Sequence, residues 1–159
     1  GRSPDFGVEA IPAKPQLRIG RDRLGFSVKS ARDGFVNVMV LGPDGSLLLL
    51  FPNSQAGDNR IKAGQTLTLP HASWALDTAE PAGAEHFLVT VTETPRDYGT
   101  LSREREYIFL KLPTGDAATA LLAQAGDKTP LLLGASPASC QGERCDHYGA
   151  ARFTINVIP

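Results

Sequence analysis

The sequence predicts a mainly β protein, an antiparallel β-sandwich with one short helix inserted near residues 114–125. Three observations predict this class. Apolar and polar residues alternate in short segments, turns rich in Gly, Pro and Asp separate those segments, and only one stretch has helical spacing. A chain of 159 residues with 42% hydrophobic residues is long enough for one core. We therefore expect a single domain over residues 1–159.

The first two predicted strands follow each other across an ARDG turn. Alternate apolar residues share one face of residues 23–30 and one face of residues 35–41. These inward residues are Leu24, Phe26, Val28, Val36, Val38 and Val40. The opposite face of residues 35–41 also carries Phe35 and Met39, so we expect this strand to lie in the centre of a sheet.

A hairpin is predicted over residues 41–53, LGPDGSLLLLFPN. Pro43-Asp44-Gly45 combines a fixed φ, a side chain that bonds its own backbone and a residue free to take positive φ. Leu47–Phe51 is then the returning strand, and Pro52 ends its ladder because it has no N–H. A membrane-seeking patch is the alternative, but a run of five apolar residues has the length of a strand.

Four more segments alternate in the same way, and one segment does not. We expect strands in residues 66–69, 87–92, 106–112 and 151–158, with inward side chains at Phe87, Val89, Val91, Phe153, Ile155 and Val157. Residues 114–126 instead have an N-cap at Thr114 or Asp116, an Ala and Leu stripe, and Gly126 as a stop. This helix would be an insertion or a crossover.

Composition and motifs argue against several functions. The net charge of −1 lacks the basic excess of a phosphate-binding surface, so we expect no nucleic-acid partner. In residues 102–107, SREREY, arginines and glutamates alternate, and we interpret them as a solvated edge whose charges compensate each other. No nucleophile elbow, Walker or dinucleotide pattern is present. We expect no catalytic residue, cofactor or metal; a weak calcium site at Asn53, Asp58 and Asn59 is the alternative.

The two cysteines lie close together in SCQGERCDHY. Cys140 and Cys145 enclose four residues including Gly142, and we expect a local disulfide. Free thiols, or a metal held with His147, are the alternatives. A disulfide would imply an oxidising compartment, which favours a periplasmic or otherwise extracytoplasmic location.

Several stretches together resemble a bacterial family, the domain of unknown function 4384. They are RDRLGFSVKS from Arg21, DGFVNVMVLGPDG, LLLFPN, DNRIKAG, the strand ending at Pro70, EPAGAEHFLVTVTE and YGAARFTINVI. The resemblance covers Leu17 to about Glu93 and, more loosely, the end from Tyr148. It departs from the family at Phe35-Val36-Asn37, where a second aromatic is usual, and in the cysteine loop with its preceding helix.

The resemblance implies an immunoglobulin-like sandwich without known catalytic residues. Such domains are typically accessories of bacterial signalling or secretion proteins, including serine/threonine kinases, caspase-like peptidases and type VI secretion components. We therefore expect a non-catalytic recognition or sensor module that binds a protein or cell-envelope partner through loops or a sheet edge. The domain itself would be soluble, and its start at Gly1 suggests a fragment of a longer protein, any membrane anchor of which we expect to lie outside this sequence.

The expected binding surface combines residues 54–62 with residues 94–105. Its candidate residues are Asp58, Asn59, Arg60, Tyr98, Arg103 and Arg105. Two alternatives belong to other classes: a thiol-redox or Cys/His-dependent enzyme built on Cys140, Cys145 and His147, and a carbohydrate or peptidoglycan binder that would use Trp74. Acidic Glu143 and Asp146 disfavour a reactive thiolate in that cluster.

The disulfide is tested by alkylation of the native protein. We expect both cysteines to resist iodoacetamide until a reductant is added, after which the intact mass rises by two carbamidomethyl groups. Closing so short a loop should stabilise the fold by about 2 kcal/mol. A single thiol that alkylates rapidly without reductant would instead favour the enzyme alternative.

Overall fold

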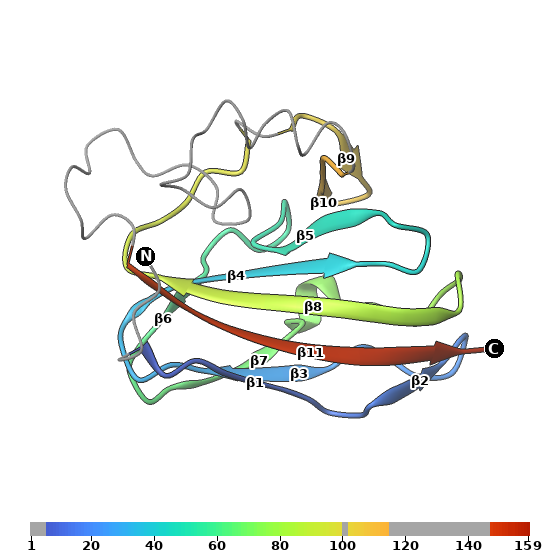
Figure 1. Ribbon diagram of the computed structural model, residues 1–159, viewed down its shortest axis with the longest axis horizontal. Coiled ribbons are helices and arrows are strands. Elements are labelled where there is room, and N and C mark those ends of the chain that lie inside the picture. Colours follow the sequence, from blue (N-terminus) through green and yellow to red (C-terminus); the bar gives the residue numbers. More distant parts are fainter. Residues whose placement is uncertain (1–5, 100–101, 115–146) are drawn as a thin grey trace.

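Two β-sheets face each other in a sandwich-like arrangement, which confirms the predicted all-β class (Figure 1). This computed structural model describes residues 6–99, 102–114 and 147–159. The cysteines Cys140 and Cys145, and the expected helix of residues 114–125 beyond Thr114, lie outside the described residues. Within the described part, no helix has the length and hydropathy needed to cross a membrane.

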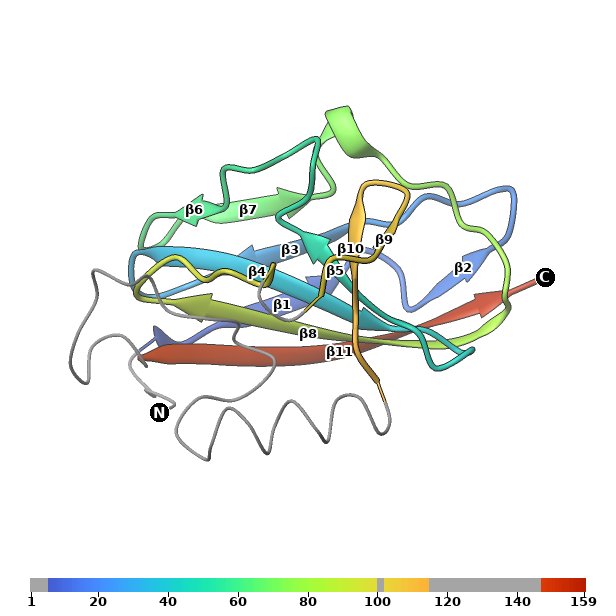
Figure 2. The same cartoon turned by 90° about the horizontal axis from the view of Figure 1, so that it is seen from above.

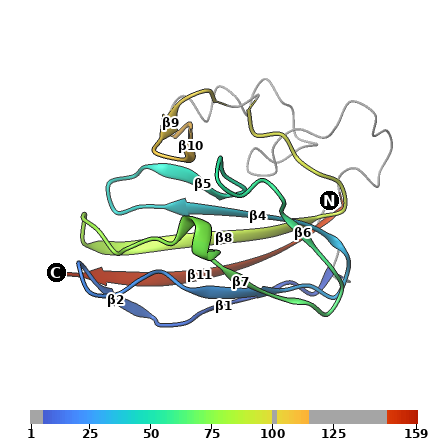
Figure 3. The ribbon, with the colours of Figure 1, turned by 180° about the vertical axis from the view of Figure 1, so that it is seen from behind.

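The smaller sheet has three antiparallel strands in the order β1-β3-β7. They are β1 (Glu9–Pro12), β3 (Phe26–Lys29) and β7 (Thr66–Leu69). A single turn of 3-10 helix, η2 (Ala72–Trp74), follows β7 and lies on the side of the sandwich (Figure 3).

The larger sheet has the order β2-β11-β8-β4-β5-β10-β9, and β6 also pairs with β4. Its strands are β2 (Gln16–Arg18), β4 (Gly34–Leu41), β5 (Leu47–Phe51), β6 (Arg60–Ile61), β8 (Gly83–Thr92), β9 (Arg105–Glu106), β10 (Phe109–Leu112) and β11 (Tyr148–Ile158). Only β2 and β11 pair in parallel. Figure 2 shows β10 running steeply across the direction of β8 and β11, as the twist of a sheet requires.

The predicted central strand is confirmed. β4 pairs with β8 along one side and with β5 and β6 along the other. Val36, Val38 and Val40 face the main core, whereas Met39 belongs to a second apolar cluster. Because both faces are covered, apolar residues occupy both sets of alternating positions in this strand.

The PDG hairpin is also confirmed. The Asp44 carboxylate accepts hydrogen bonds from the N–H and the hydroxyl of Ser46 at 3.0 and 2.7 Å, and Gly45 adopts a φ of 84°. The leucine run that follows is a buried strand. A register shift lies between Val38 and Met39, opposite the end of β5. Because an extra residue changes the alternation there, Leu50 and Phe51 both enter the main core.

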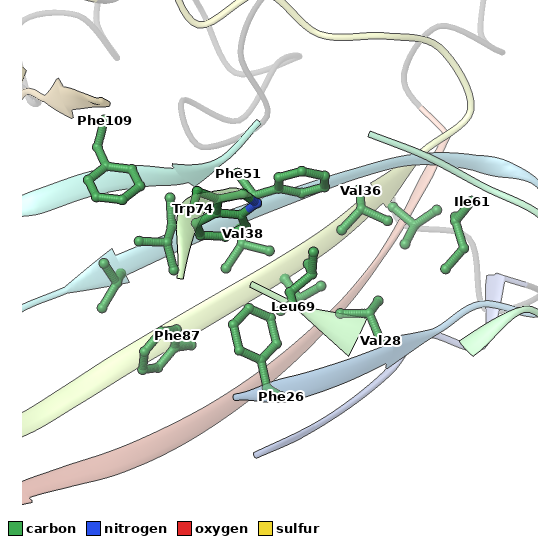
Figure 4. Packing of buried hydrophobic residues seen from close by; sticks show 14 of the residues in the cluster. Phe26, Val28, Val36, Val38, Phe51, Ile61, Leu69, Trp74, Phe87 and Phe109 are labelled. Carbon is green, nitrogen blue, oxygen red and sulfur yellow. The ribbon is translucent and has the colours of Figure 1, made fainter. Parts of the chain in front are cut away.

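Two groups of aromatic rings fill that core (Figure 4). Trp74 of η2 is 3% exposed and stacks on Phe51 with ring centroids 5.7 Å apart. Phe87 stacks on Phe153 at 4.6 Å, and Phe26 contacts both rings. The inward positions expected for β8 and β11 are therefore correct.

The second apolar cluster lies on the outer face of the larger sheet. It consists of Met39, Leu49, Tyr98, Leu110 and Leu112, with Leu47 and Leu88 packed against it. This cluster explains why β5 and β10 are apolar at nearly every position: their side chains alternate between two hydrophobic environments.

One predicted strand is wrong in extent. Residues 106–112 form the end of β9, a turn and β10 rather than one strand. Tyr107 adopts a φ of 57° and is 79% exposed, and Phe109 pairs back onto Glu106. The turn lacks the Gly, Pro or Asn that usually mark a reversal, so alternation alone extended the strand through it.

The entry of the chain into β4 requires a glycine. A Cβ added to Gly34 would lie 2.6 Å from the carbonyl oxygen of Thr92 and 2.7 Å from the Val91 side chain. Because a backbone atom on the paired strand cannot move freely, we expect Gly34→Ala to lower the free energy of unfolding by about 2 kcal/mol. Denaturant titration would measure this change.

Gly57→Ala is the matched control, because no atom lies within 4 Å of its added Cβ. We expect this substitution to change the free energy of unfolding by less than about 0.5 kcal/mol. Equal losses in both variants would show that the contact between β4 and β8 is looser than described.

Candidate functional site

A depression of about 500 Å³ brings two distant parts of the sequence together beside the second apolar cluster. The turn after β5 forms one side, and segments on both sides of residues 100–101 form the other. The lining residues are Leu49, Pro52, Asn53, Ser54, Arg96, Asp97, Tyr98, Gly99, Ser102, Arg103, Arg105 and Leu110. This hollow is the arginine depression. It contains Tyr98, Arg103 and Arg105 of the predicted binding residues.

The turn side of the arginine depression is held by several hydrogen bonds. The Asn53 carbonyl Oδ1 accepts from the N–H groups of Gln55 and Ala56, and its amide donates to the Leu50 carbonyl. Ser54 donates from both its N–H and its hydroxyl to the Ile108 carbonyl, at 3.3 and 3.1 Å. The two Ser54 bonds tie the turn to the β9–β10 hairpin.

Three arginines face one carboxylate in the lining of the depression. Arg103 and Arg105 are separated by one residue, and Arg96 is only 9% exposed. Asp97 is the sole acidic residue in the described part of the lining, and its Oδ1 accepts a hydrogen bond from Gly99 N–H at 2.8 Å. The depression is therefore electropositive, although the whole chain has a net charge of −1.

The interpretation of SREREY as a solvated edge is confirmed. Residues 103–106 are all exposed, and β9 is the last strand in the order of the larger sheet. Arg103 and Arg105 line the arginine depression, whereas Glu106 lines a different cavity. Successive side chains in an extended segment point to opposite sides, so the neighbours Arg105 and Glu106 of β9 reach different surfaces.

Tyr98 differs from the expectation of an exposed loop residue. Its side chain is 3% exposed and packs in the second apolar cluster with Leu49 and Leu110. Burial raises the pKa of its phenol, while the charge of Arg96 acts in the opposite direction. Tyr98 therefore forms part of the floor that supports the arginines rather than a surface contact.

The other predicted binding residues lie elsewhere. Asp58 and Arg60 form an exposed two-bond ion pair at 3.0 and 3.2 Å and line a second depression of about 580 Å³. The Arg60 guanidinium lowers the pKa of the Asp58 carboxyl. Asn59 has a structural role. Its side-chain amide donates to the Val36 carbonyl at 2.8 Å, and its main-chain carbonyl accepts a hydrogen bond from Val36 N–H. The single surface expected from the sequence is thus two separate surfaces.

The residues of the alternative hypotheses also have definite positions. Asn53, Asp58 and Asn59 of the calcium alternative are engaged in the turn, the ion pair and the bond to β4 described above. Within residues 6–99, 102–114 and 147–159, no group of three His, Cys, Asp or Glu side chains could hold a metal ion. His147 Nδ1 lies 3.2 Å from the Glu93 carboxylate. Trp74 is buried, so its ring is not available as a surface platform.

Arg96 and the leucines of the floor line the arginine depression but are not among the binding residues predicted from the sequence. Arg96 lies in TPRDYG, a stretch with the composition of an ordinary loop, and nothing in that pattern indicates a buried arginine. Leu49 and Leu110 could have been found, because a strand that is apolar at nearly every position buries side chains on both faces.

The burial of Tyr98 has a consequence at alkaline pH. The unfolded chain loses the phenol proton near the ordinary pKa of 10.0, whereas the folded chain keeps it to higher pH. The stability that Tyr98 contributes is complete below about pH 10 and is lost as pH rises further. We expect the free energy of unfolding to fall less between about pH 9 and about pH 11 in Tyr98→Phe than in the parent protein.

Tyr107→Phe is the control for this experiment, because that side chain is 79% exposed. It should retain the alkaline decline of the parent protein. An unchanged decline in Tyr98→Phe would contradict the burial of the Tyr98 phenol.

Comparison with known proteins identifies the family of the chain. No curated protein and no solved structure matches the chain. The model of one family, the domain of unknown function 4384, matches residues 16–95, which is just over half of the chain and runs from β2 to the loop after β8. The resemblance noted in the sequence is thereby confirmed, and the chain belongs to the family of the domain of unknown function 4384.

Proposed function

We propose that this domain is a non-catalytic recognition module that binds an acidic segment of a protein partner in the arginine depression. It would serve a larger bacterial signalling or secretion-associated protein, such as a type VI secretion-linked serine/threonine kinase, outside the cytoplasm. The observation that carries the binding proposal is the convergence of Arg96, Arg103 and Arg105 over an apolar floor.

The chemistry of the guanidinium group supports a carboxylate ligand. Arginine presents several N–H donors in a planar fork that matches the two oxygens of a carboxylate. Arg103 and Arg105 lie one residue apart in an extended segment, so their side chains extend toward the same surface. Two such groups can receive acidic side chains that alternate along an extended peptide.

The floor of the depression supports a protein partner rather than an isolated ion. Leu49 and Leu110 belong to the second apolar cluster, and Pro52 adds an apolar edge. Protein interfaces combine a desolvated apolar centre with arginine and a polar rim. Aliphatic groups of a partner would contact the leucines while its carboxylates reach the arginines.

The rigidity of the turn supports a preformed site. The Ser54 bonds to Ile108 and the Asn53 bonds within the turn fix one wall of the depression before any partner arrives. A wall that is already ordered loses little conformational entropy on binding. This property suits a recognition module whose partner supplies the flexible segment.

The extracytoplasmic location depends on the pair Cys140 and Cys145, whose spacing permits a local disulfide. The accessory role is proposed from the family, which as a domain of unknown function has no assigned activity in its description. Both parts of the proposal are separate from the binding experiment below.

Removal of the two arginines tests the binding site. The probe is a fluorescein-labelled peptide of alternating Glu and Leu residues, followed by fluorescence anisotropy. We expect Arg103→Ser/Arg105→Ser to weaken binding about ten-fold at low salt, because each arginine–carboxylate pair near the surface contributes about 0.5–1 kcal/mol. The difference should shrink as salt screens these pairs.

Arg21→Ser/Lys29→Ser provides the matched control, because both side chains are cations on exposed residues that do not line the depression. We expect it to change affinity less than two-fold, about the effect of a small change in net charge. Equal weakening by the two double variants, or equal binding of a Lys-Leu peptide, would refute the proposed site.

A further inference from the structure

A third hollow, a cavity of about 350 Å³, lies at the end of the sandwich that contains the β4–β5 turn. The inner face of the larger sheet forms one wall, and the loop of residues 76–81 forms another. In Figure 1 this is the end at which β8 begins and β11 ends. None of its lining residues belongs to the arginine depression.

The inner wall of this cavity is apolar. Val40, Leu50, Phe87 and Phe109 contribute to it and are all less than 10% exposed. Phe87 and Phe109 lie toward the same end of the core in Figure 4. An apolar part of a ligand would therefore contact side chains that the fold already holds in place.

The mouth of the cavity carries charge of one sign. Among the described residues that line the cavity are five carboxylates, at Asp44, Asp77, Glu80, Glu85 and Glu106, and no Lys, Arg or His. Asp77 pairs with Arg23 at 2.9 Å, and Asp44 accepts both hydrogen bonds of Ser46. For Glu80, Glu85 and Glu106 the structure gives no such bond.

Glu85 occupies a position that the pattern of β8 assigns to the core. It lies opposite Ile155 in the ladder between β8 and β11, and two residues before Phe87 on the same face. Burial, together with the negative charge of Asp44, raises the pKa of this carboxyl. A carboxylate on an inward row is costly for folding, which points to a role in binding.

Thr78 is a second and independent feature of the same wall. It is 8% exposed, and its hydroxyl Oγ1 has no hydrogen-bond partner among the residues that the structure describes. Its backbone is fixed, since its N–H donates to the Asp22 carbonyl and its carbonyl accepts from Gly20 N–H, both at 3.0 Å. Buried hydroxyl groups are almost always bonded, so this one is available to a polar group of a ligand.

We propose that this cavity binds an organic cation, an ammonium or guanidinium group carried on an apolar body. The apolar body contacts Val40, Leu50 and Phe87, the positive charge faces Glu85, and the Thr78 hydroxyl accepts a hydrogen bond from the cationic N–H group. This site is separate from the arginine depression and selects the opposite charge, so either proposal can fail without the other.

The test is a titration of the full chain by nuclear magnetic resonance with three probes of one shape: hexylammonium, hexanol and hexanoate. We expect hexylammonium to shift the backbone amide signals of residues 42–48 and 76–87. Hexanol should bind about five-fold more weakly, and hexanoate more weakly still, because only the charge differs. Equal affinity for the three probes, or shifts outside these residues, would overturn the proposal.

Glu85→Gln tests whether Glu85 faces the positive charge of the ligand. We expect it to weaken hexylammonium binding about five-fold without a loss of stability at neutral pH, because partial burial penalises the charged form of this carboxyl. Glu9→Gln is the matched control, since Glu9 is exposed on β1 and outside the cavity, and it should leave affinity unchanged. Equal effects of the two variants would reject Glu85.

Two further experiments test the rim of the cavity and the molecule that supplies the cation. Ala79→Phe places a ring on an exposed rim residue and should abolish binding; unchanged binding would overturn the assignment of the cavity.

The blocked peptide acetyl-Leu-Lys-amide carries the same cation on a protein segment. Binding at least as tight as hexylammonium would identify a lysine side chain as the ligand, and weaker binding would identify a free amine; both outcomes support an organic cation.

Discussion

The pairing of β8 with β4 and β11 at the centre of the larger sheet is the constraint on which the rest of the molecule depends. Its inner side chains meet the three-stranded sheet, and its outer side chains meet the second apolar cluster. Even the polar residues on its outer side are enclosed: Asn37 and Thr90, which face each other in the ladder, are 0% and 2% exposed. Because β4 and the part of β8 that faces it are covered on both sides, the hollows described above lie at the ends of the strands and in the loops.

The β9–β10 hairpin couples the two surfaces that this centre leaves available. Arg105 lines one surface and its neighbour Glu106 lines the other, although both belong to a strand of two residues. A chain with a net charge of −1 thus carries two hollows whose described linings have opposite signs of charge. The Ser54 bonds to Ile108 hold this hairpin against the turn after β5, so the geometry of both surfaces depends on the same short connection.

The features that the sequence predicts correctly are those that depend on local alternation and turn chemistry. The inward valines of β4, the PDG turn and the aromatic rows of β8 and β11 all follow from a period of two and from the properties of Pro, Asp and Gly. The features that it does not predict depend on which side of a strand meets which neighbour. Tyr98 is buried because the loop packs on Leu49 and Leu110, and no local pattern specifies that contact. No local pattern specifies either that Asp58 and Arg60 line one depression and that Arg103 and Arg105 line another.

Departures from the alternating pattern are therefore more informative about binding than the pattern itself. Phe87, Val89 and Val91 satisfy the rule for an inward row, and Glu85 breaks it at the one end where the row opens into a cavity. Arg96 breaks the rule for loops in the same sense, because it is a buried charge beneath two exposed ones. Each residue imposes a desolvation cost on the fold that an apolar side chain of similar size would avoid. A sequence tends to keep such a cost where a ligand of opposite charge offsets it, which is why Glu85 locates the proposed cation site.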